Sequence, residues 1–154
     1  MCPRRSTAPS FLLACVLAVT AACSGDRAAS VDEPWGANSV TAAQLAQELA
    51  GPDKPVVVCT APPVMYRAGH IPGAVLHGPA TSASVVNGLK AWASTLPKSS
   101  SVVIYCGCCP LEHCPNLRPS YAALKDLGLR QLRVLLLPND FGTDWVRPGF
   151  PVER

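Results

Sequence analysis

The chain has 154 residues, and 49% of them are hydrophobic, so the composition predicts one folded domain with its own core and excludes a disordered chain. The formal net charge is only +3, and the sequence has no basic cluster beyond Arg4 and Arg5. We therefore expect no nucleic-acid partner, because proteins that bind nucleic acids usually carry a basic patch or stripe.

The first 22 residues have the order of a bacterial export signal. Two arginines are followed by an apolar run at 11–22 that ends in two alanines, and Cys23 comes next. This order resembles the lipobox of bacterial lipoproteins, in which Cys23 would be lipidated and become the first mature residue. The resemblance implies a membrane-anchored lipoprotein of the bacterial cell envelope that faces the periplasm or the cell exterior. A plain signal peptide with a chance cysteine is the alternative.

Residues 23–38 are expected to form a tether between the membrane and a domain over 39–154. The tether is rich in small and polar residues and contains proline and glycine, which is typical of a flexible linker. Trp35, within this stretch, is a candidate to pack back onto the domain.

In the domain, helical patterns alternate with short apolar runs. A capping-box pattern at 41–44 begins the first predicted helix, which ends at Gly51. The other predicted elements follow in chain order: a strand at 56–58, a proline-rich loop at 61–63, a turn and short strand within 67–76, a helix at about 82–94, a strand at 102–105, a helix at about 118–127, a strand at 132–137, and a loop-rich tail at 138–154 with a single turn near 143–146. This alternation predicts an α/β fold in which helices flank a parallel sheet.

Four cysteines lie between the predicted strand 102–105 and the helix that follows it: Cys106, Cys108, Cys109 and Cys114. Ligands of open parallel sheets bind at the carboxyl ends of the strands, and this loop lies at such an end. The free N–H groups and the dipole of a following helix favour a negatively charged sulfur and lower the pKa of a cysteine. We therefore expect the loop to carry sulfur chemistry first, and to bind a metal second.

The three later cysteines of the loop allow three interpretations. Cys108, Cys109 and Cys114 could resolve a persulfide or cycle as a disulfide. They could instead bind Zn or Cu(I) together with Cys106, since soft thiolates select such metals. One pair could also be oxidised simply to hold a long loop. A bridge between Cys108 and Cys109 is not expected, because adjacent positions force strained disulfide geometry.

Two segments resemble rhodanese-like domains. Residues 69–74 read Gly-His-Ile-Pro-Gly-Ala, which matches a signature of that family. The strand 102–105 with Cys106 after it, and the ending Gly-Phe-Pro-Val at 149–152, resemble the C-terminal half of such a domain. The resemblance covers about residues 39–154 and implies a single rhodanese-like domain. It also implies that Cys106 takes sulfur from a small anionic donor such as thiosulfate, holds it as a persulfide, and passes it to a thiol or another thiophilic acceptor.

This chemistry implies a cradle of N–H groups around the anionic sulfur. Gly107 and Cys108 would form part of it, and Asn116 and Arg118 are the further candidates for binding the substrate. No resident cofactor is expected, unless the thiolates of the loop hold a metal.

The chain departs from the family's pattern around the expected site. The loop after Cys106 is longer than usual by about five residues, Asn116 falls where the family has an arginine, and Arg118 lies two positions further on. The first strand is followed by Cys-Thr-Ala at 59–61, where the family has Asp-x-Arg. The pattern Cys-Gly-Cys-Cys-Pro resembles an exported subgroup of rhodanese-like proteins.

A sulfurtransferase is therefore the first hypothesis for function. The alternatives are a non-catalytic cysteine-rich module that binds Zn or Cu(I), and a thiol–disulfide redox protein on the same scaffold. Outside the loop, we expect His70 to order the turn before Pro72 and Cys59 to be a buried apolar residue. Phe141 and Trp145 are expected to cover the core rather than to bind a ligand.

Overall fold

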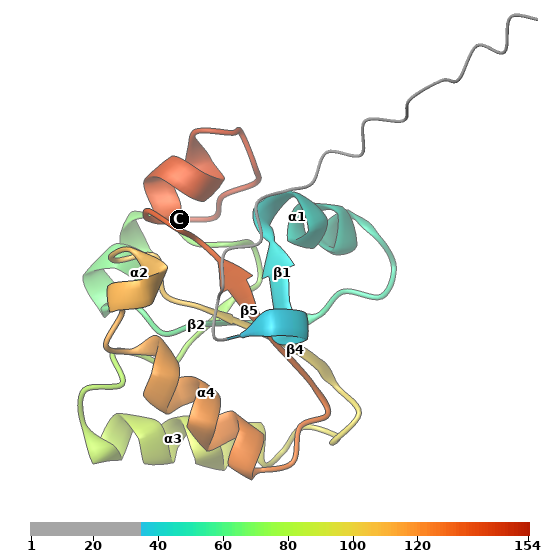
Figure 1. Cartoon of the computed structure of the whole chain (residues 1–154), viewed down its shortest axis with the longest axis vertical. Coiled ribbons are helices and arrows are strands. Elements are labelled where there is room, and N and C mark those ends of the chain that lie inside the picture. Colours follow the sequence, from blue (N-terminus) through green and yellow to red (C-terminus); the bar gives the residue numbers. More distant parts are fainter. Residues whose placement is uncertain (1–34) are drawn as a thin grey trace, which may run out of the picture. The chain divides into compact units, whose positions relative to one another are not determined.

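The computed structural model describes residues 35–154, so the predicted signal at 1–22 and Cys23 lie outside the described residues. The centre of the domain is a sheet of five parallel strands in the order β1-β5-β4-β2-β3 (Figure 1). The strands are β1 (Ser39–Thr41), β2 (Val56–Cys59), β3 (Val75–Leu76), β4 (Ser101–Tyr105) and β5 (Gln131–Leu136). The predicted α/β fold with a parallel sheet is confirmed.

Within residues 35–154, four α-helices and three shorter turns surround the sheet: α1 (Ala42–Ala50), α2 (Pro63–Ala68), α3 (Ala83–Ala93), α4 (Leu117–Asp126), η1 (Gly36–Asn38), η2 (Leu111–His113) and the π-helical turn η3 (Gly142–Val146). Helices α3 and α4 pack side by side, and α1 lies apart from them beside β1 (Figure 1). In the part of the chain that the structure describes, no helix is both long and apolar enough to cross a membrane.

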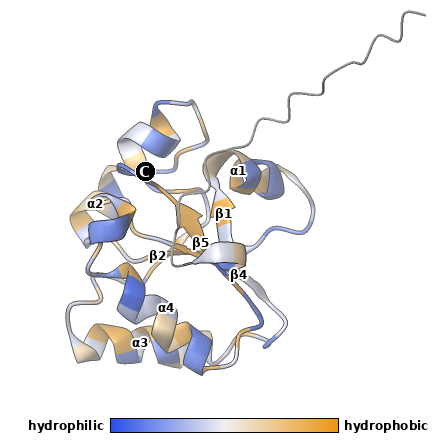
Figure 2. Ribbon diagram, in the orientation of Figure 1, coloured by the Kyte–Doolittle hydropathy of each residue, from blue (hydrophilic) through white to orange (hydrophobic). Residues whose placement is uncertain are grey.

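The elements follow from the local sequence. Strand β4 is a Val/Ile run that is buried from Val102 to Tyr105, as expected for an inner strand covered on both faces. The ribbon is orange along the visible part of β5, which is mostly buried, and alternates between blue and orange along the helices, as amphipathic helices do (Figure 2). The predicted capping box is present at α1, where the Gln44 N–H donates to the Thr41 hydroxyl and the Thr41 N–H donates to the Gln44 side chain.

Two elements differ from the sequence prediction. Strand β1 was not expected; it has three residues and forms by pairing with the end of β5, from Val134 to Leu136. Helix α2 was not expected either; it lies between the predicted proline-rich loop at 61–63 and the predicted turn that starts at 67. It forms because Pro63 occupies its first turn, where the missing N–H costs nothing.

Part of the predicted tether packs on the domain. Trp35 is 8% exposed, and its ring meets the Tyr121 ring edge-on with centroids 4.9 Å apart. Turn η1 follows it, and the Ser39 hydroxyl donates to the Gly36 carbonyl. The expected contact of Trp35 with the domain is therefore present.

The C-terminal segment, residues 138–154, closes over the carboxyl ends of the central strands. Trp145 is fully buried and lies between the rings of Phe141 and Phe150, which confirms that it covers the core. Further along, His70 and Glu153 exchange two backbone hydrogen bonds of 2.9 Å. His70 is buried, and its Nδ1 lies 2.9 Å from the Tyr66 carbonyl oxygen, so it orders this turn as expected.

Candidate active site

The site begins where β4 ends. Cys106 follows Tyr105 directly and is only 4% exposed. The chain then turns sharply at Gly107, which has φ +84°, a conformation that other residues rarely adopt. The Gly107 carbonyl accepts a 3.1 Å hydrogen bond from the Phe141 N–H, and a Cβ at position 107 would lie 2.6 Å from the Phe141 Cβ. The C-terminal segment therefore packs directly on the turn that presents Cys106.

The loop brings three thiols together. The Sγ atoms of Cys106, Cys108 and Cys114 all lie within 4.8 Å of one another, and those of Cys106 and Cys108 are 3.1 Å apart. Cys106 and Cys114 are buried, whereas Cys108 is half-buried. Cys109 lies at the edge of this cluster, since its sulfur is 3.4 Å from that of Cys108 but does not converge with the other two.

Cys106 is the thiolate of the cluster. The Cys114 thiol donates a hydrogen bond to the Cys106 sulfur, and the N–H and thiol of Cys108 and the side-chain amide of Asn116 donate others. Together these donors outweigh the effect of burial and lower the pKa of Cys106 to about 5. At neutral pH Cys106 therefore holds a negative charge, as a sulfur nucleophile must.

The two neighbouring thiols stay protonated, because burial and the hydrogen bond to Cys106 both raise their pKa values. Burial and the hydrogen bond to Cys106 raise the pKa of Cys108 to about 12. The pKa of Cys114 is also raised, first by the hydrogen bond that its thiol donates to Cys106 and then by burial. The cluster therefore holds one thiolate between two thiol donors.

Asn116 completes the arrangement from the other end of the loop. It is 3% exposed, and its Nδ2 lies 3.6 Å from the Cys106 sulfur and 3.9 Å from the Cys108 sulfur. Its Oδ1 is buried and has no partner among the described residues. The N–H groups of Asn116 and Leu117, at the start of α4, face the Cys114 sulfur. The helix N-terminus thus faces Cys114, which in turn donates to Cys106.

A narrow pocket of about 20 Å³ opens over Cys106. This is room for roughly one water-sized group. The walls are mostly apolar and come from the ends of β2 and β4, from α2 and from the C-terminal segment: Cys59, Ala61, Met65, Tyr66, Gly69, Tyr105, Gly107 and Phe141. Cys59 is buried, as expected, and burial is the main reason that its pKa is raised.

A wider hollow of about 440 Å³ lies beside the narrow pocket. The two share Met65, Gly69, Gly107 and Phe141 as lining residues. Cys108, Asp140 and Arg154 also line the hollow, so it offers both signs of charge next to the loop. A reactant in this hollow would meet the loop at Cys108 and reach Cys106 through the narrow pocket.

Comparisons with known proteins agree with this architecture. The rhodanese-like domain of Alr3790 from Anabaena sp. is similar over 75% of this chain and 78% of its own, with 22% identity and a TM-score of 0.56. BH2092 from Bacillus halodurans is similar over 75% of each chain, with 21% identity and a TM-score of 0.58. No protein-family model and no curated protein matches the chain.

The chain has the rhodanese-like fold. Its Cys106 follows an inner strand of that fold, as the sequence resemblance implied, and the long loop after it holds three further cysteines. Of the predicted substrate-binding residues, the rhodanese-like fold brings Gly107, Cys108 and Asn116 to Cys106.

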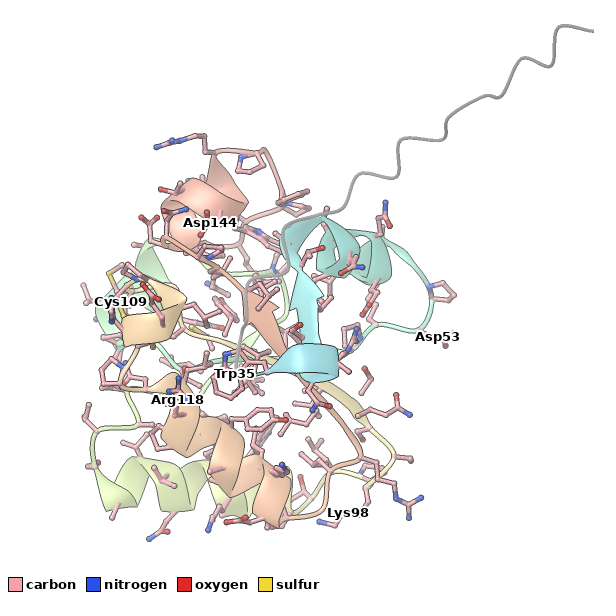
Figure 3. All side chains as sticks on the ribbon, viewed as in Figure 1. Trp35, Asp53, Lys98, Cys109, Arg118 and Asp144 are labelled. Atoms are coloured by element: carbon pink, nitrogen blue, oxygen red, sulfur yellow. The ribbon has the colours of Figure 1, made fainter. Side chains whose placement is uncertain are left out.

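Arg118 has a different neighbour. Its side chain is exposed, and its guanidinium carbon lies 5.4 Å from the centre of the Trp35 ring, which is within cation–π range (Figure 3). It lines neither hollow at Cys106. His113 is also exposed and lies 3.2 Å from a Glu112 carboxylate oxygen, on the outer side of the loop. The loop therefore presents neutral donors, rather than a basic side chain, to the Cys106 sulfur.

Sequence reasoning missed the walls of the narrow pocket. Tyr66 lies on the unexpected helix α2, and Phe141 was assigned to the core alone. Only the pairing of β2 with β4, which sets Cys59 opposite Tyr105, brings these segments to the same edge of the sheet. The order of the predicted strands along the chain did not indicate that β2 and β4 are neighbours in the sheet.

Proposed function

We propose that the chain is a sulfurtransferase that carries sulfane sulfur as a persulfide on Cys106. The observation that carries the proposal is the state of this cysteine. It is the one member of the thiol cluster whose pKa is lowered, and it lies at the floor of a pocket with room for about one small group. One added sulfur atom fits that space, whereas the rest of a donor would have to stay in the wider hollow.

The first half-reaction needs only the donor. The Cys106 thiolate attacks the outer sulfur of thiosulfate, the S–S bond of the donor breaks, and sulfite leaves with the electron pair. Cys106 is left as a persulfide anion. The N–H of Cys108 and the amide of Asn116, which donate to the thiolate in the resting protein, are placed to stabilise negative charge at this sulfur.

The second half-reaction restores the enzyme. The thiolate of an acceptor attacks the outer sulfur of the persulfide, the S–S bond to Cys106 breaks, and Cys106 leaves as a thiolate. A low pKa makes Cys106 a good leaving group in this step. The two half-reactions balance without an added oxidant or reductant.

The test is the intact mass of the full-length protein, purified without oxygen, before and after thiosulfate. We expect a gain of one sulfur atom that is removed by cyanide and located on Cys106. The Cys106→Ser variant should gain no sulfur, and the matched Cys109→Ser variant should gain it as the wild type does. The proposal is wrong if Cys106→Ser still takes up cyanide-labile sulfur, or if the wild type takes up none from either thiosulfate or an organic persulfide.

A thiol–disulfide redox role is the second candidate, because the sulfurs of Cys106 and Cys108 are only 3.1 Å apart. A redox protein would cycle between two masses that differ by two hydrogens and would keep no added sulfur. The same mass measurement, with a small disulfide in place of thiosulfate, therefore separates the two functions.

We also propose that the protein works in the bacterial cell envelope, held to the membrane by a lipid on Cys23. The support is the sequence order of the first 22 residues and Cys23, which lie outside the described part of the structure. Expression in a bacterial host with a labelled fatty acid should label the wild type but not the Cys23→Ser variant, which should leave the membrane fraction. Label in the variant, or an unlabelled wild type, would contradict this location.

A further inference from the structure

The three thiols of the cluster, the proposed nucleophile among them, could also bind a metal ion. Cys106, Cys108 and Cys114 converge from the two ends of one loop, with all three sulfurs within 4.8 Å of one another. A metal–thiolate bond is about 2.3 Å long, so three sulfurs placed evenly around one ion lie about 4 Å apart. The sulfurs of Cys106 and Cys108 are 3.1 Å apart and would separate by about 1 Å to share an ion, a small change for three thiols that already converge.

The number of donors favours one class of ion. Structural zinc sites take four protein ligands, usually in a tetrahedron. The fourth thiol of the loop, Cys109, does not converge with the other three, and the imidazole of His113 is exposed beside Glu112. Within residues 35–154, three soft sulfur donors converge without a fourth, and this set suits Cu(I), which thiolate ligands select.

The loop and the start of α4 already place N–H donors around the three sulfur atoms, where they would stabilise thiolates. The Cys108 N–H faces the Cys106 sulfur, and the N–H groups of Asn116 and Leu117 face the Cys114 sulfur. The Asn116 amide reaches the sulfurs of both Cys106 and Cys108. Such outer hydrogen bonds hold metal ligands in place and are part of a built site.

We propose that Cys106, Cys108 and Cys114 form a three-thiolate site for one Cu(I) ion. Binding replaces the remaining thiol protons, which pass to solvent, and no electron is transferred. Cys108 is half-buried and lines the wider hollow, so it is the ligand that an incoming copper complex meets first. Cys109, at the outer side of the loop, is not a ligand (Figure 3).

The site does not require the proposed sulfur transfer, but the two uses of Cys106 exclude each other. A Cys106 that holds Cu(I) cannot attack a sulfur donor. If the proposed function holds, bound Cu(I) switches sulfur transfer off, and a strong Cu(I) chelator restores it. If sulfur transfer is absent, the metal site can still be measured by itself.

The test is an anaerobic titration of the reduced full-length protein with Cu(I) supplied as the complex of a coloured chelator. We expect one Cu(I) per chain, with three sulfur neighbours in X-ray absorption. Cys108→Ser and Cys114→Ser should weaken binding by about 100-fold or more, because loss of a ligand costs at least as much as loss of an outer partner, and Asn116→Ala should weaken it by about 10-fold. The matched Cys109→Ser variant should bind within about 2-fold of the wild type.

Three results would overturn the proposal. One is a Cys109→Ser variant that loses as much affinity as Cys108→Ser. Another is a first shell of two or four sulfurs, or one Zn(II) bound in preference to Cu(I). The third is unchanged copper binding in Cys108→Ser, the half-buried ligand whose replacement should disturb the fold least. A variant with Cys2→Ser, Cys15→Ser and Cys23→Ser must still bind one Cu(I), since the proposed ligands are Cys106, Cys108 and Cys114.

Discussion

The Cys114 thiol donates to the Cys106 sulfur, although one residue precedes helix α4 and the other follows strand β4. This hydrogen bond is the largest of the effects that lower the pKa of Cys106. The N-terminus of α4 acts on the other side of Cys114, through the N–H groups of Asn116 and Leu117. The long loop thus places one thiol between the helix N-terminus and the Cys106 sulfur.

The first prediction concerns the pH dependence of Cys106. Its pKa is about 5 in the folded protein, so its alkylation by a small reagent should be nearly constant above pH 6 and should fall as the pH drops through about 5. Cys114→Ala removes the strongest donor, so the midpoint should move to higher pH. Peptide mass spectrometry of iodoacetamide-treated protein between pH 4 and about 9 measures both midpoints.

Cys109→Ala is the control for this shift, because the Cys109 sulfur contacts Cys108 and not Cys106. Its profile should match that of the wild type. Equal midpoints in Cys114→Ala and the wild type would mean that Cys114 does not stabilise the thiolate. In the wild type, alkylation near neutral pH should favour Cys106 over Cys108, whose pKa is raised to about 12.

The second prediction concerns the turn at Gly107. Gly107→Ala puts a side chain at φ +84° and brings its Cβ within 2.6 Å of the Phe141 Cβ. We expect a loss of about 2–4 kcal/mol in the free energy of unfolding, from the left-handed backbone and the overpacking together. Urea unfolding measures this loss.

Gly128→Ala isolates the backbone part of that cost. Gly128 has φ +79°, but a Cβ there would have nothing within 4 Å. This variant should lose only about 1 kcal/mol. If the two variants lose the same free energy of unfolding, Phe141 does not pack tightly on Gly107 and does not support the turn that presents Cys106.

The third prediction concerns the ion pair that joins α1 to β5. The two terminal guanidinium nitrogens of Arg133 donate to the Glu48 carboxylate at 2.7 Å, and this contact lowers the pKa of Glu48 below its ordinary value of 4.5. Because the pair is partly exposed, Glu48→Gln should cost only about 1 kcal/mol at neutral pH. Urea unfolding at several pH values measures this cost, with Asp53→Asn as the control, because Asp53 is exposed and has no ion pair among the described residues.

The sign of the pH dependence follows from the lowered pKa. The folded state binds the Glu48 proton less tightly than the unfolded state, so the stabilisation is fully present above pH 4.5 and is lost as the pH falls through the lower, folded value. The difference between wild type and Glu48→Gln should therefore shrink in acid. A difference that persists below the folded pKa would assign the stabilisation to packing instead.

The sequence predicts the inner strands well and the small elements poorly. Apolar runs are enough to identify β2, β4 and β5, because strands buried inside a sheet are mostly apolar. In β5 the run is interrupted by Arg133, whose side chain reaches Glu48. Strand β1 has only three residues and depends on pairing with β5, and α2 has no apolar repeat in its six residues. Their stability comes from tertiary contacts that no local pattern encodes.

The same limit applies to the candidate site. The position of Cys106 follows from a strand end before a helix, which the sequence indicates directly. The partners of its sulfur depend on the path of the loop, and sequence spacing alone does not distinguish Cys114, which donates to Cys106, from Cys109, which does not. The sequence therefore indicates Cys106 as the candidate nucleophile but leaves the roles of the other thiols open.

The last prediction concerns Arg118, which the sequence indicates as a ligand for an anionic donor. In the structure its guanidinium lies over Trp35, so this role requires the side chain to leave that ring when the donor binds. Arg118→Gln should then raise KM for thiosulfate, a dianion, more than for an organic persulfide, while kcat stays close to that of the wild type. Steady-state kinetics with both donors measures the two constants. A Trp35→Leu variant, which frees the guanidinium, should lower KM for thiosulfate. If neither substitution changes the ratio of the two KM values, Arg118 serves only to pack on Trp35, and the neutral donors around Cys106 hold the anionic donor by themselves.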